Sequence, residues 1–100
     1  MRKSINGLSA IVEGSFNLDP FEAALFVFCN RSRDRIKILE WDTDGFWIYF
    51  KRLEKGRFRW PTLGEDATMI LSGDELHHLL GSPRVVQKLM RKEVKIGAVI

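Results

Sequence analysis

Basic side chains that can contact phosphate groups are concentrated in the middle of the chain. Arg and Lys donate hydrogen bonds to phosphate oxygens whatever the base sequence, and so position a protein on a nucleic acid. Four of these residues occupy alternate positions, and an extended segment would present them along one side. We predict that eight residues contact DNA phosphates: Arg31, Arg33, Arg35, Lys37, Lys51, Arg52, Arg57 and Arg59. An exposed hairpin tip without a ligand would show the same alternation.

The net charge of +3 is unevenly distributed along the 100 residues. Residues 29–60 hold nine Lys or Arg against five acids, and residues 84–100 hold five against one. Between these blocks, residues 61–83 hold four acids and no base. Such asymmetry is typical of proteins that bind a polyanion, but it also fits mutual pairing of the blocks or an ordinary solvated surface.

A second group of bases lies near the C-terminus. Ser82 and Pro83 form a cap and first turn typical of a helix start, so we predict a helix over residues 83–95. Its basic stripe recurs at helical spacing and comprises Arg84, Lys88, Arg91 and Lys95. This stripe suits a phosphate backbone or an acidic protein surface. The apolar side is short and lacks aromatic residues, which argues against binding to a membrane surface.

The other residues capable of chemistry favour structural roles. Asp42 and Asp44 lie around a turn, where Asp commonly makes local hydrogen bonds. His77 and His78 are adjacent, whereas a metal pair on a helix needs a spacing of three or four residues. The single Cys29 cannot form an internal disulfide, which fits a reducing cytoplasm, and its apolar surroundings indicate a buried thiol. We therefore predict no enzymatic activity, no cofactor and no metal.

Aromatic residues leave two interpretations open. Tyr49 and the three Trp residues have flat rings on which the bases of a single strand can stack. In so small a domain, a place in the hydrophobic core is the more common use of such rings.

The predicted positions of the basic residues depend on three apolar runs within residues 35–61. Turns that end in Gly45 and Gly56 separate the runs and predict an antiparallel meander. With a three-residue loop in the first turn, Trp41 would face Trp47. One face of the meander would then become basic at Arg52, Arg57 and Arg59. A slip of one residue would exchange the two faces of a strand.

Together these elements predict a single α+β domain over residues 1–100. Its mainly antiparallel β-meander would have four or five strands, at residues 24–29, 35–41, 46–53, 57–60 and 68–71. Two to three helices would cover the sheet, at residues 3–14, 73–80 and 83–95. No run approaches the roughly 18 apolar residues of a membrane span, and no signal peptide is visible, so we expect a cytoplasmic protein without a membrane partner.

Several motifs, in order along the chain, resemble those of a known family. They are M-R-K-S-I-N-G-L at 1–8, D-P-F at 19–21, L-F-V-F-C-N-R at 25–31, D-R-I-K-I-L at 34–39, W-D-T-D-G-F at 41–46 and Y-F-K-R-L-E-K-G-R-F-R-W-P at 49–61. Through them, residues 1–81 resemble the TnpB accessory protein of the insertion-sequence-66 type of bacterial transposon, also called the Orf-two-like family. Residues 82–100 would add the basic amphipathic helix and a tail.

The resemblance implies a non-catalytic helper that is encoded beside a separate transposase and is needed for transposition. Two functions stay open. The protein would bind DNA at the transposon ends through a basic sheet face, or it would dock the transposase or another helper without touching DNA.

The chain also departs from the family pattern. Family members usually carry a strand-like segment before the M-R-K motif, and usually have Arg where this chain has Cys29. The first departure leads us to expect a shortened copy with an exposed sheet edge, through which a homodimer or a partner strand could pair. The second departure, Cys29 in place of Arg, leaves a gap in the row of alternating bases that continues at residues 31, 33, 35 and 37.

Overall fold

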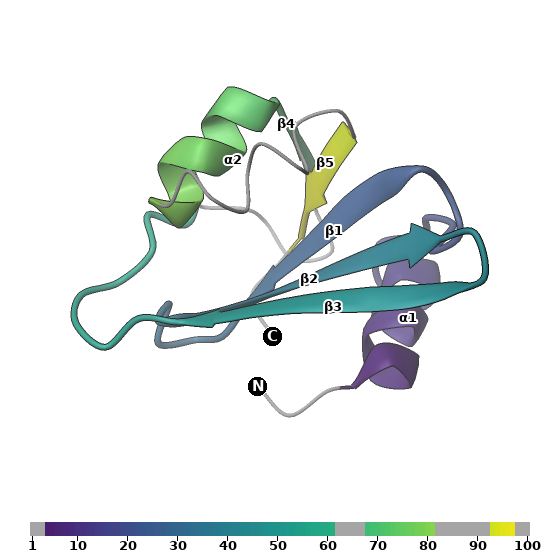
Figure 1. Ribbon diagram of the computed structural model, residues 1–100, viewed down its shortest axis with the longest axis horizontal. Helices are drawn as coiled ribbons and strands as arrows, with labels where there is room; N and C mark the ends of the chain where they lie inside the picture. Colours follow the sequence, from purple (N-terminus) through teal and green to yellow (C-terminus); the bar gives the residue numbers. More distant parts are fainter. Residues whose placement is uncertain (1–3, 62–67, 82–92, 98–100) are drawn as a thin grey trace.

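The computed structural model describes residues 4–61, 68–81 and 93–97, and these residues form a five-stranded sheet between two helices (Figure 1). The strands are β1 (Ala24–Cys29), β2 (Arg35–Asp42), β3 (Gly45–Arg52), β4 (Met69–Leu71) and β5 (Glu93–Ile96), and the helices are α1 (Ile5–Gly14) and α2 (Gly73–Leu80). The order across the sheet is β3-β2-β1-β5-β4. Of the described pairs, β1 and β5 run parallel and the others antiparallel, which confirms the predicted α+β fold with a mainly antiparallel sheet.

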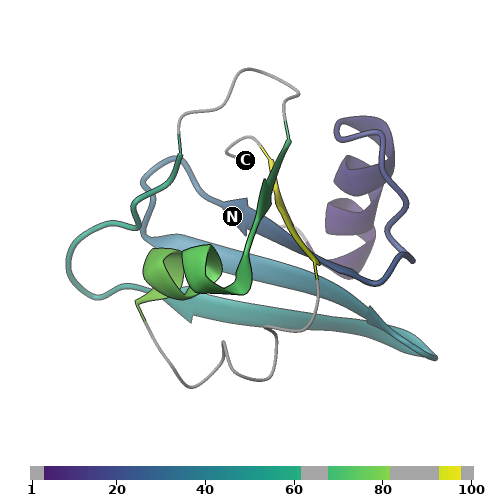
Figure 2. The ribbon, with the colours of Figure 1, turned by 90° about the horizontal axis from the view of Figure 1, so that it is seen from above.

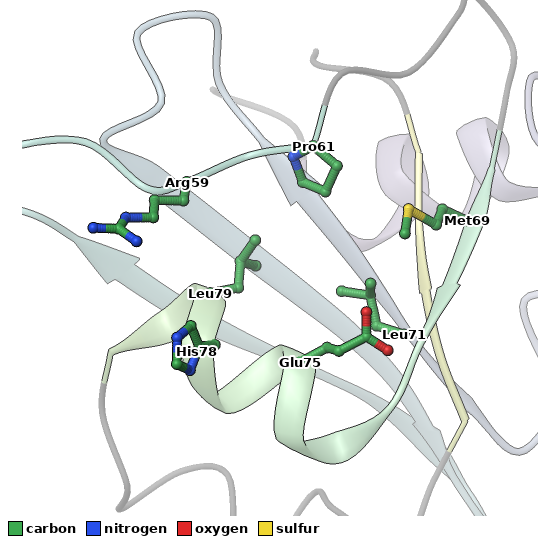
Figure 3. Close-up of a pocket in the computed structure, with 7 residues that line it drawn as sticks. All are labelled: Arg59, Pro61, Met69, Leu71, Glu75, His78 and Leu79. Atoms are coloured by element: carbon green, nitrogen blue, oxygen red, sulfur yellow. The ribbon is translucent and has the colours of Figure 1, made fainter.

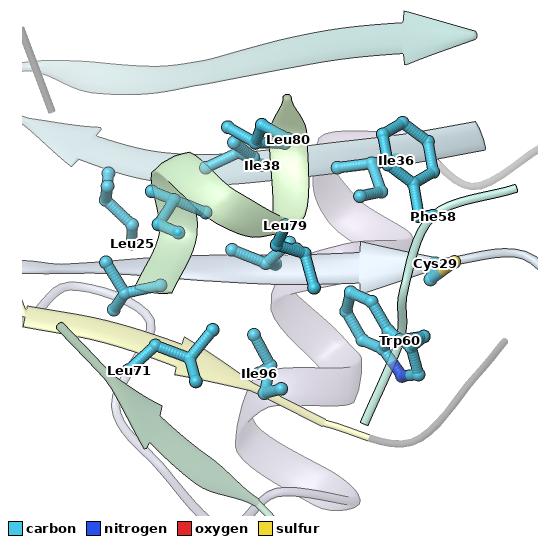
Figure 4. Packing of buried hydrophobic residues seen from close by; sticks show 13 residues of the cluster. Leu25, Cys29, Ile36, Ile38, Phe58, Trp60, Leu71, Leu79, Leu80 and Ile96 are labelled. Atoms are coloured by element: carbon cyan, nitrogen blue, oxygen red, sulfur yellow. The ribbon is translucent and has the colours of Figure 1, made fainter. Parts of the chain in front are cut away.

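The central strand β1 is buried on both faces because each helix covers one side of it. Successive residues of a strand point to opposite faces. Phe26 therefore belongs to one core with Leu8 and Val12 of α1, whereas Leu25 belongs to another with Leu76 of α2. Figure 2 shows α1 and α2 on either side of the sheet, and Figure 4 shows the core on the α2 side. The apolar run at 24–29 thus serves two cores, as a strand buried on both faces should.

The hairpin of β2 and β3 corrects the predicted register by one residue. Its loop has two residues rather than three, because Asp42 pairs with Gly45. Trp41 consequently faces Phe46, and the predicted pairing of Trp41 with Trp47 is wrong. A positive φ, which glycine usually supplies in such turns, occurs instead at Thr43, at 50°. The slip exchanges the faces of β3 relative to the prediction.

Residues 57–60 do not form the predicted strand. After Gly56, whose φ is 80°, the chain crosses the α2 side of the sheet as an extended segment without a ladder. Phe58 and Trp60 are buried in the core on that side (Figure 4). The alternation of Phe58 and Trp60 with exposed residues therefore reflects burial, as predicted, but these two side chains anchor a crossing segment rather than a strand.

The predicted helix over 83–95 is wrong at its C-terminal end. Residues 82–92 lie outside the described residues, but residues 93–96 form β5, which pairs with β1 and β4. Val94 and Ile96 alternate into the core on the α2 side. The helical spacing of the basic residues had masked this alternation.

The capping signals predicted for α2 are confirmed. The side-chain oxygen of Ser72 accepts a hydrogen bond from the Glu75 amide, and the Glu75 carboxylate accepts one from the Ser72 amide, both at 3.1 Å. Gly81 ends the helix in the left-handed conformation, with φ at 64°. Lys51 of β3 donates to the Leu80 carbonyl at 2.8 Å, where a positive charge also complements the helix dipole. The bond from Lys51 holds the C-terminal end of α2 against the sheet.

A partly buried ion pair connects β5 to the segment before β1. Lys95 Nζ lies 2.6 Å from Glu22 Oε1, and the two side chains are 12% and 33% exposed. We expect Glu22→Ala to lower the free energy of unfolding by about 1–3 kcal/mol, because it leaves the Lys95 charge largely out of water without a partner. Urea unfolding would measure the change.

Two further variants separate this effect from ordinary surface mutation. Adding Lys95→Met to Glu22→Ala should recover most of the lost stability, since the unpaired charge is then gone. Glu13→Ala, at an exposed position of α1, should change stability by no more than about 0.5 kcal/mol. Equal effects of Glu22→Ala and Glu13→Ala would contradict the prediction.

Candidate nucleic-acid interface at one end of the sheet

The turn between β1 and β2 presents arginines on a tightly bonded backbone. Asn30 is buried, and its Oδ1 accepts hydrogen bonds from the amides of Asp34 at 3.0 Å and Arg35 at 2.9 Å. Its Nδ2 donates to the Asp34 carboxylate at 2.6 Å. The turn needs a left-handed residue, which is Arg33 with φ at 59°. Arg31 and Arg33 are therefore exposed at the tip of a turn whose shape Asn30 maintains.

Asp34 is the acidic residue within this turn. The hydrogen bond from Asn30 lowers the pKa of Asp34, and the nearby charges of Arg35 and Arg57 act in the same direction. The carboxylate thus stays ionised and offsets part of the positive charge around it.

A second basic segment is bonded to the same turn. The Leu53 amide donates to the Asp34 carbonyl at 2.7 Å, and the Phe58 amide donates to the Arg33 carbonyl at 2.6 Å. These bonds place the bend that contains Arg57 beside the turn at residues 30–34. Figure 1 shows both segments at the end of the sheet that lies away from α1.

The first pair of β2 and the last pair of β3 complete this cluster. Arg35 and Arg52 lie directly opposite each other in the register. Like charges at opposed positions repel each other. The Glu54 carboxylate relieves part of the repulsion, because it accepts hydrogen bonds from Arg52 at 2.8 and 3.0 Å. The side chains of Arg52 and Glu54 are 55% and 77% exposed, so this ion pair contributes little to stability.

We call this cluster the basic end and define it as Arg31, Arg33, Arg35, Arg52, Lys55 and Arg57. Within residues 30–35 and 52–57, these six cationic side chains stand against two carboxylates, Asp34 and Glu54. Lys55 was missing from the sequence prediction. Its position beside Gly56, in the bend of a basic segment, was the signal that could have identified it.

Three of the predicted phosphate contacts lie away from the basic end. Lys51 points to the α2 side, where it is bonded to the helix terminus. Lys37 lies on the opposite face, with its ammonium 5.8 Å from the centre of the Phe50 ring. Arg59 follows the bend and lies beside α2. The predicted basic sheet face is therefore replaced by a basic end, because the one-residue slip puts Lys51 and Arg52 on different faces from those expected.

Of the secondary basic stripe, the structure describes Lys95 alone. Arg84, Lys88 and Arg91 lie outside the described residues. Lys95 belongs to β5 and is paired with Glu22, so it is not part of a helical stripe.

A shallow pocket adjoins Arg59 on the α2 side (Figure 3). Its lining combines apolar side chains, among them Leu71 and Leu79, with the polar side chains of Arg59, Glu75 and His78. Glu75 is already engaged in capping α2. The pocket thus has Arg59 and His78 as its other polar side chains.

Two side chains with raised pKa values lie in or against the core on the α2 side, Cys29 and Tyr49. Cys29 is fully buried in β1, as predicted, and burial raises the pKa of its thiol to about 11. A thiol with so high a pKa supplies little thiolate at neutral pH. Burial and the hydrogen bond to Glu40 raise the pKa of Tyr49 to about 12. Neither residue lines the pocket beside Arg59.

The histidines of the described residues belong to no cluster of metal ligands. His77 and His78 are exposed on α2. Within residues 4–61, 68–81 and 93–97, no group of three or more His, Cys, Asp or Glu side chains could hold a metal ion. Neither described helix has the length and apolar character needed to cross a membrane.

Comparison with known proteins gives the chain a family. The family described as IS66 Orf2 like protein matches residues 1–89. Two relatives are known from Sinorhizobium fredii (strain NBRC 101917 / NGR234). The uncharacterized protein y4jC is 31% identical over 99 residues, covering 96% of this chain and 84% of the relative. The uncharacterized protein y4hO is 35% identical over 80 residues, covering 80% of this chain and 69% of the relative.

No solved structure gives a significant match to the chain. The family match includes the turn at residues 30–34, the hairpin and the bend, and therefore the whole basic end. It also includes the motifs from which the resemblance was first inferred. The family implies an accessory role associated with transposition. By this match, the chain belongs to the IS66 Orf2-like family.

Proposed function

We propose that this protein is a non-catalytic accessory protein of DNA transposition that binds the DNA backbone through the basic end. The observation that carries the proposal is the convergence of two segments far apart in sequence. The segments 30–35 and 52–58 are hydrogen-bonded to each other and bring six cationic side chains to one end of the sheet. The family supplies the context of transposition.

The opposed pair of Arg35 and Arg52 supports an anionic ligand at this place. Two guanidinium groups on facing positions repel each other when nothing lies between them. A phosphate that accepts hydrogen bonds from both would turn the repulsion into attraction, and Arg is well suited to such contacts. The basic end is thus most stable when it meets a polyanion.

The arrangement favours recognition of the backbone over recognition of bases. The basic side chains project from a turn and a bend, and no described helix lies at their centre to enter a major groove. Binding should therefore depend on charge and salt more than on base sequence. A cytoplasmic location, where bacterial DNA lies, is part of this proposal.

Fluorescence anisotropy with a labelled DNA duplex would test the proposal. We expect binding at low salt, with the logarithm of the binding constant falling linearly as the logarithm of the salt concentration rises. If three to five phosphates are contacted, the slope should be roughly −2.7 to −4.5. Transposon-end and unrelated duplexes should show similar slopes. Absence of binding at low salt would contradict the proposal.

Docking of the transposase is the second candidate function, and the exposed aromatic residues of β3 favour it. Trp47 and Phe50 are each 54% exposed on this outer strand. Pull-down of the transposase with a variant that has lost DNA binding would separate the two functions. If the variant still captures the transposase, docking does not depend on the basic end. If the variant loses the transposase as well as the DNA, the result favours an assembly that DNA holds together.

A further inference from the structure

The outer edge of β3 has backbone groups whose direction can be deduced from the ladder. The bond from the Leu53 amide to the Asp34 carbonyl shows that Arg35 and Arg52 form a non-hydrogen-bonded pair. Because the two kinds of pair alternate in an antiparallel ladder, the even-numbered residues of β3 direct their N–H and C=O groups away from β2. These residues are Phe46, Ile48, Phe50 and Arg52. A strand with such an edge can template the pairing of another strand.

The described residues of β3 lack the sequence features that usually prevent such pairing. Proteins protect an edge strand with proline, inward-pointing charges, bulges or short length. β3 has eight residues, no proline, and no charged residue before Lys51. Its central residues are aromatic or aliphatic, and two of the rings are more than half exposed.

The exposed ring of Trp47 is held in place. Its Nε1 donates to Asp42 Oδ2 at 3.0 Å, and its ring stacks on Tyr49 with 6.5 Å between centres. The Tyr49 hydroxyl donates to the Glu40 carboxylate at 2.7 Å. A ring fixed in this way loses little conformational freedom when it is covered.

We propose that β3 pairs in antiparallel fashion with β3 of a second copy of this chain, with Ile48 of the two copies at the two-fold axis. A two-fold axis perpendicular to the sheet puts the α1 side of both copies on one face of the joined sheet and the α2 side of both copies on the other. In this register the outward N–H and C=O groups of the two β3 strands form hydrogen bonds with each other. Nearly all residues of each strand are then paired. The two sheets then become one continuous sheet.

The side chains favour this register over its neighbours. Trp47 meets Tyr49 of the second copy on one face, and Phe46 meets Phe50 on the other, so that aromatic pairs form on both faces. Arg52 then lies opposite Asp44 of the second copy, which matches opposite charges. Centring the axis on Tyr49 would instead put Lys51 opposite Trp47 and Arg52 opposite Phe46. Centring it on Trp47 would put Phe50 opposite Asp44.

Disulfide trapping tests the register directly. At the axis, facing Cα atoms of a hydrogen-bonded pair lie about 5.5 Å apart, within the roughly 4.4–6.8 Å that a disulfide spans. We expect Ile48→Cys to form a covalent dimer on mild oxidation. Phe50→Cys is the matched control, because its two copies would lie four residues apart along the strands, at about 14 Å. The native Cys29 is fully buried and should not contribute.

Sedimentation velocity on the full chain without DNA tests the dimer itself. The wild type should dimerise as its concentration rises through the micromolar range, and Phe50→Lys should raise the dimer dissociation constant at least tenfold. Ile70→Lys is the control, because Ile70 is 62% exposed on β4, the strand at the other edge. It should leave the dissociation constant unchanged.

Distinct results would overturn the proposal. A wild type that stays monomeric at all concentrations would contradict the dimer, and would leave a strand of another protein as the occupant of this edge. Cross-linking of Phe50→Cys as fast as Ile48→Cys would contradict the register. The measurements use no DNA, so their failure is separate from failure of the proposed DNA binding.

Discussion

Replacing Arg31 and Arg57 together with glutamine is expected to lower the affinity for duplex DNA by roughly ten- to a hundredfold near 0.1 M salt. The two residues come from the turn and the bend, and both are exposed. Each phosphate contact that is lost should also make the slope of the salt dependence shallower by about 0.9. Fluorescence anisotropy at several salt concentrations measures both quantities. Folding should be unaffected, because no described hydrogen bond depends on either side chain.

A charge-matched control shows whether position or net charge matters. Asn6→Glu combined with Ala10→Glu lowers the net charge by the same amount, at exposed positions of α1. That helix lies away from the basic end (Figure 1). We expect this variant to retain most of the affinity and the full salt slope. Equal losses in the two variants would show that only the net charge acts, and would remove the basic end as the binding site.

The substitution Gly97→Ala is expected to cost about 1–3 kcal/mol of stability through overpacking. Gly97 follows β5, and a Cβ atom added there would overlap the ring of Phe16. That ring is 7% exposed and stacks on Phe28 with 5.6 Å between centres, so it has little space into which to withdraw. In a domain of this size, each kcal/mol corresponds to roughly 4–8 °C in Tm. Urea and thermal unfolding would measure the loss.

Gly14→Ala provides the matched control for this prediction. Gly14 ends α1, has no atom within 4 Å of an added Cβ, and does not need a positive φ. Alanine there should be neutral or should stabilise by about 0.4–1 kcal/mol. In the Gly97→Ala background, Phe16→Leu should cost less than it does alone, since both substitutions act on one contact. Strictly additive effects would contradict the contact between Phe16 and Gly97.

Local signals predicted several elements well because local physics determines them. The capping box at Ser72 and Glu75, with Gly81 after the last leucine, is a short-range pattern and defines α2 completely. The run at 24–29 has the length and β-branched or aromatic character of a buried strand. The proximity of Arg31, Arg33 and Arg57 also follows from local signals, because these residues lie in the two turns, whereas Lys37, Lys51 and Arg59 lie elsewhere.

Other features depended on contacts that no local pattern contains. The register of the hairpin depends on which residue of the turn takes a positive φ. Glycine is the usual residue for this conformation, but Thr43 adopts it here instead of Gly45. Whether Glu93–Ile96 is helix or strand depended on its pairing with β1, nearly seventy residues earlier. The spacing of the bases fitted a helix, but burial of Val94 and Ile96 in the sheet prevailed. Tertiary pairing overrides local propensity in such cases.

The place of β5 between β1 and β4 has a consequence during synthesis. β4 pairs with β5 in the described sheet and is separated by it from β1. While the ribosome is still adding residues before 93, β1 is left with an open side, and β4 has no strand to join. A nascent chain that stalls at this point would expose an apolar strand edge to chaperones or to other nascent chains. Release of β5 from the exit tunnel is therefore the event that completes the described sheet.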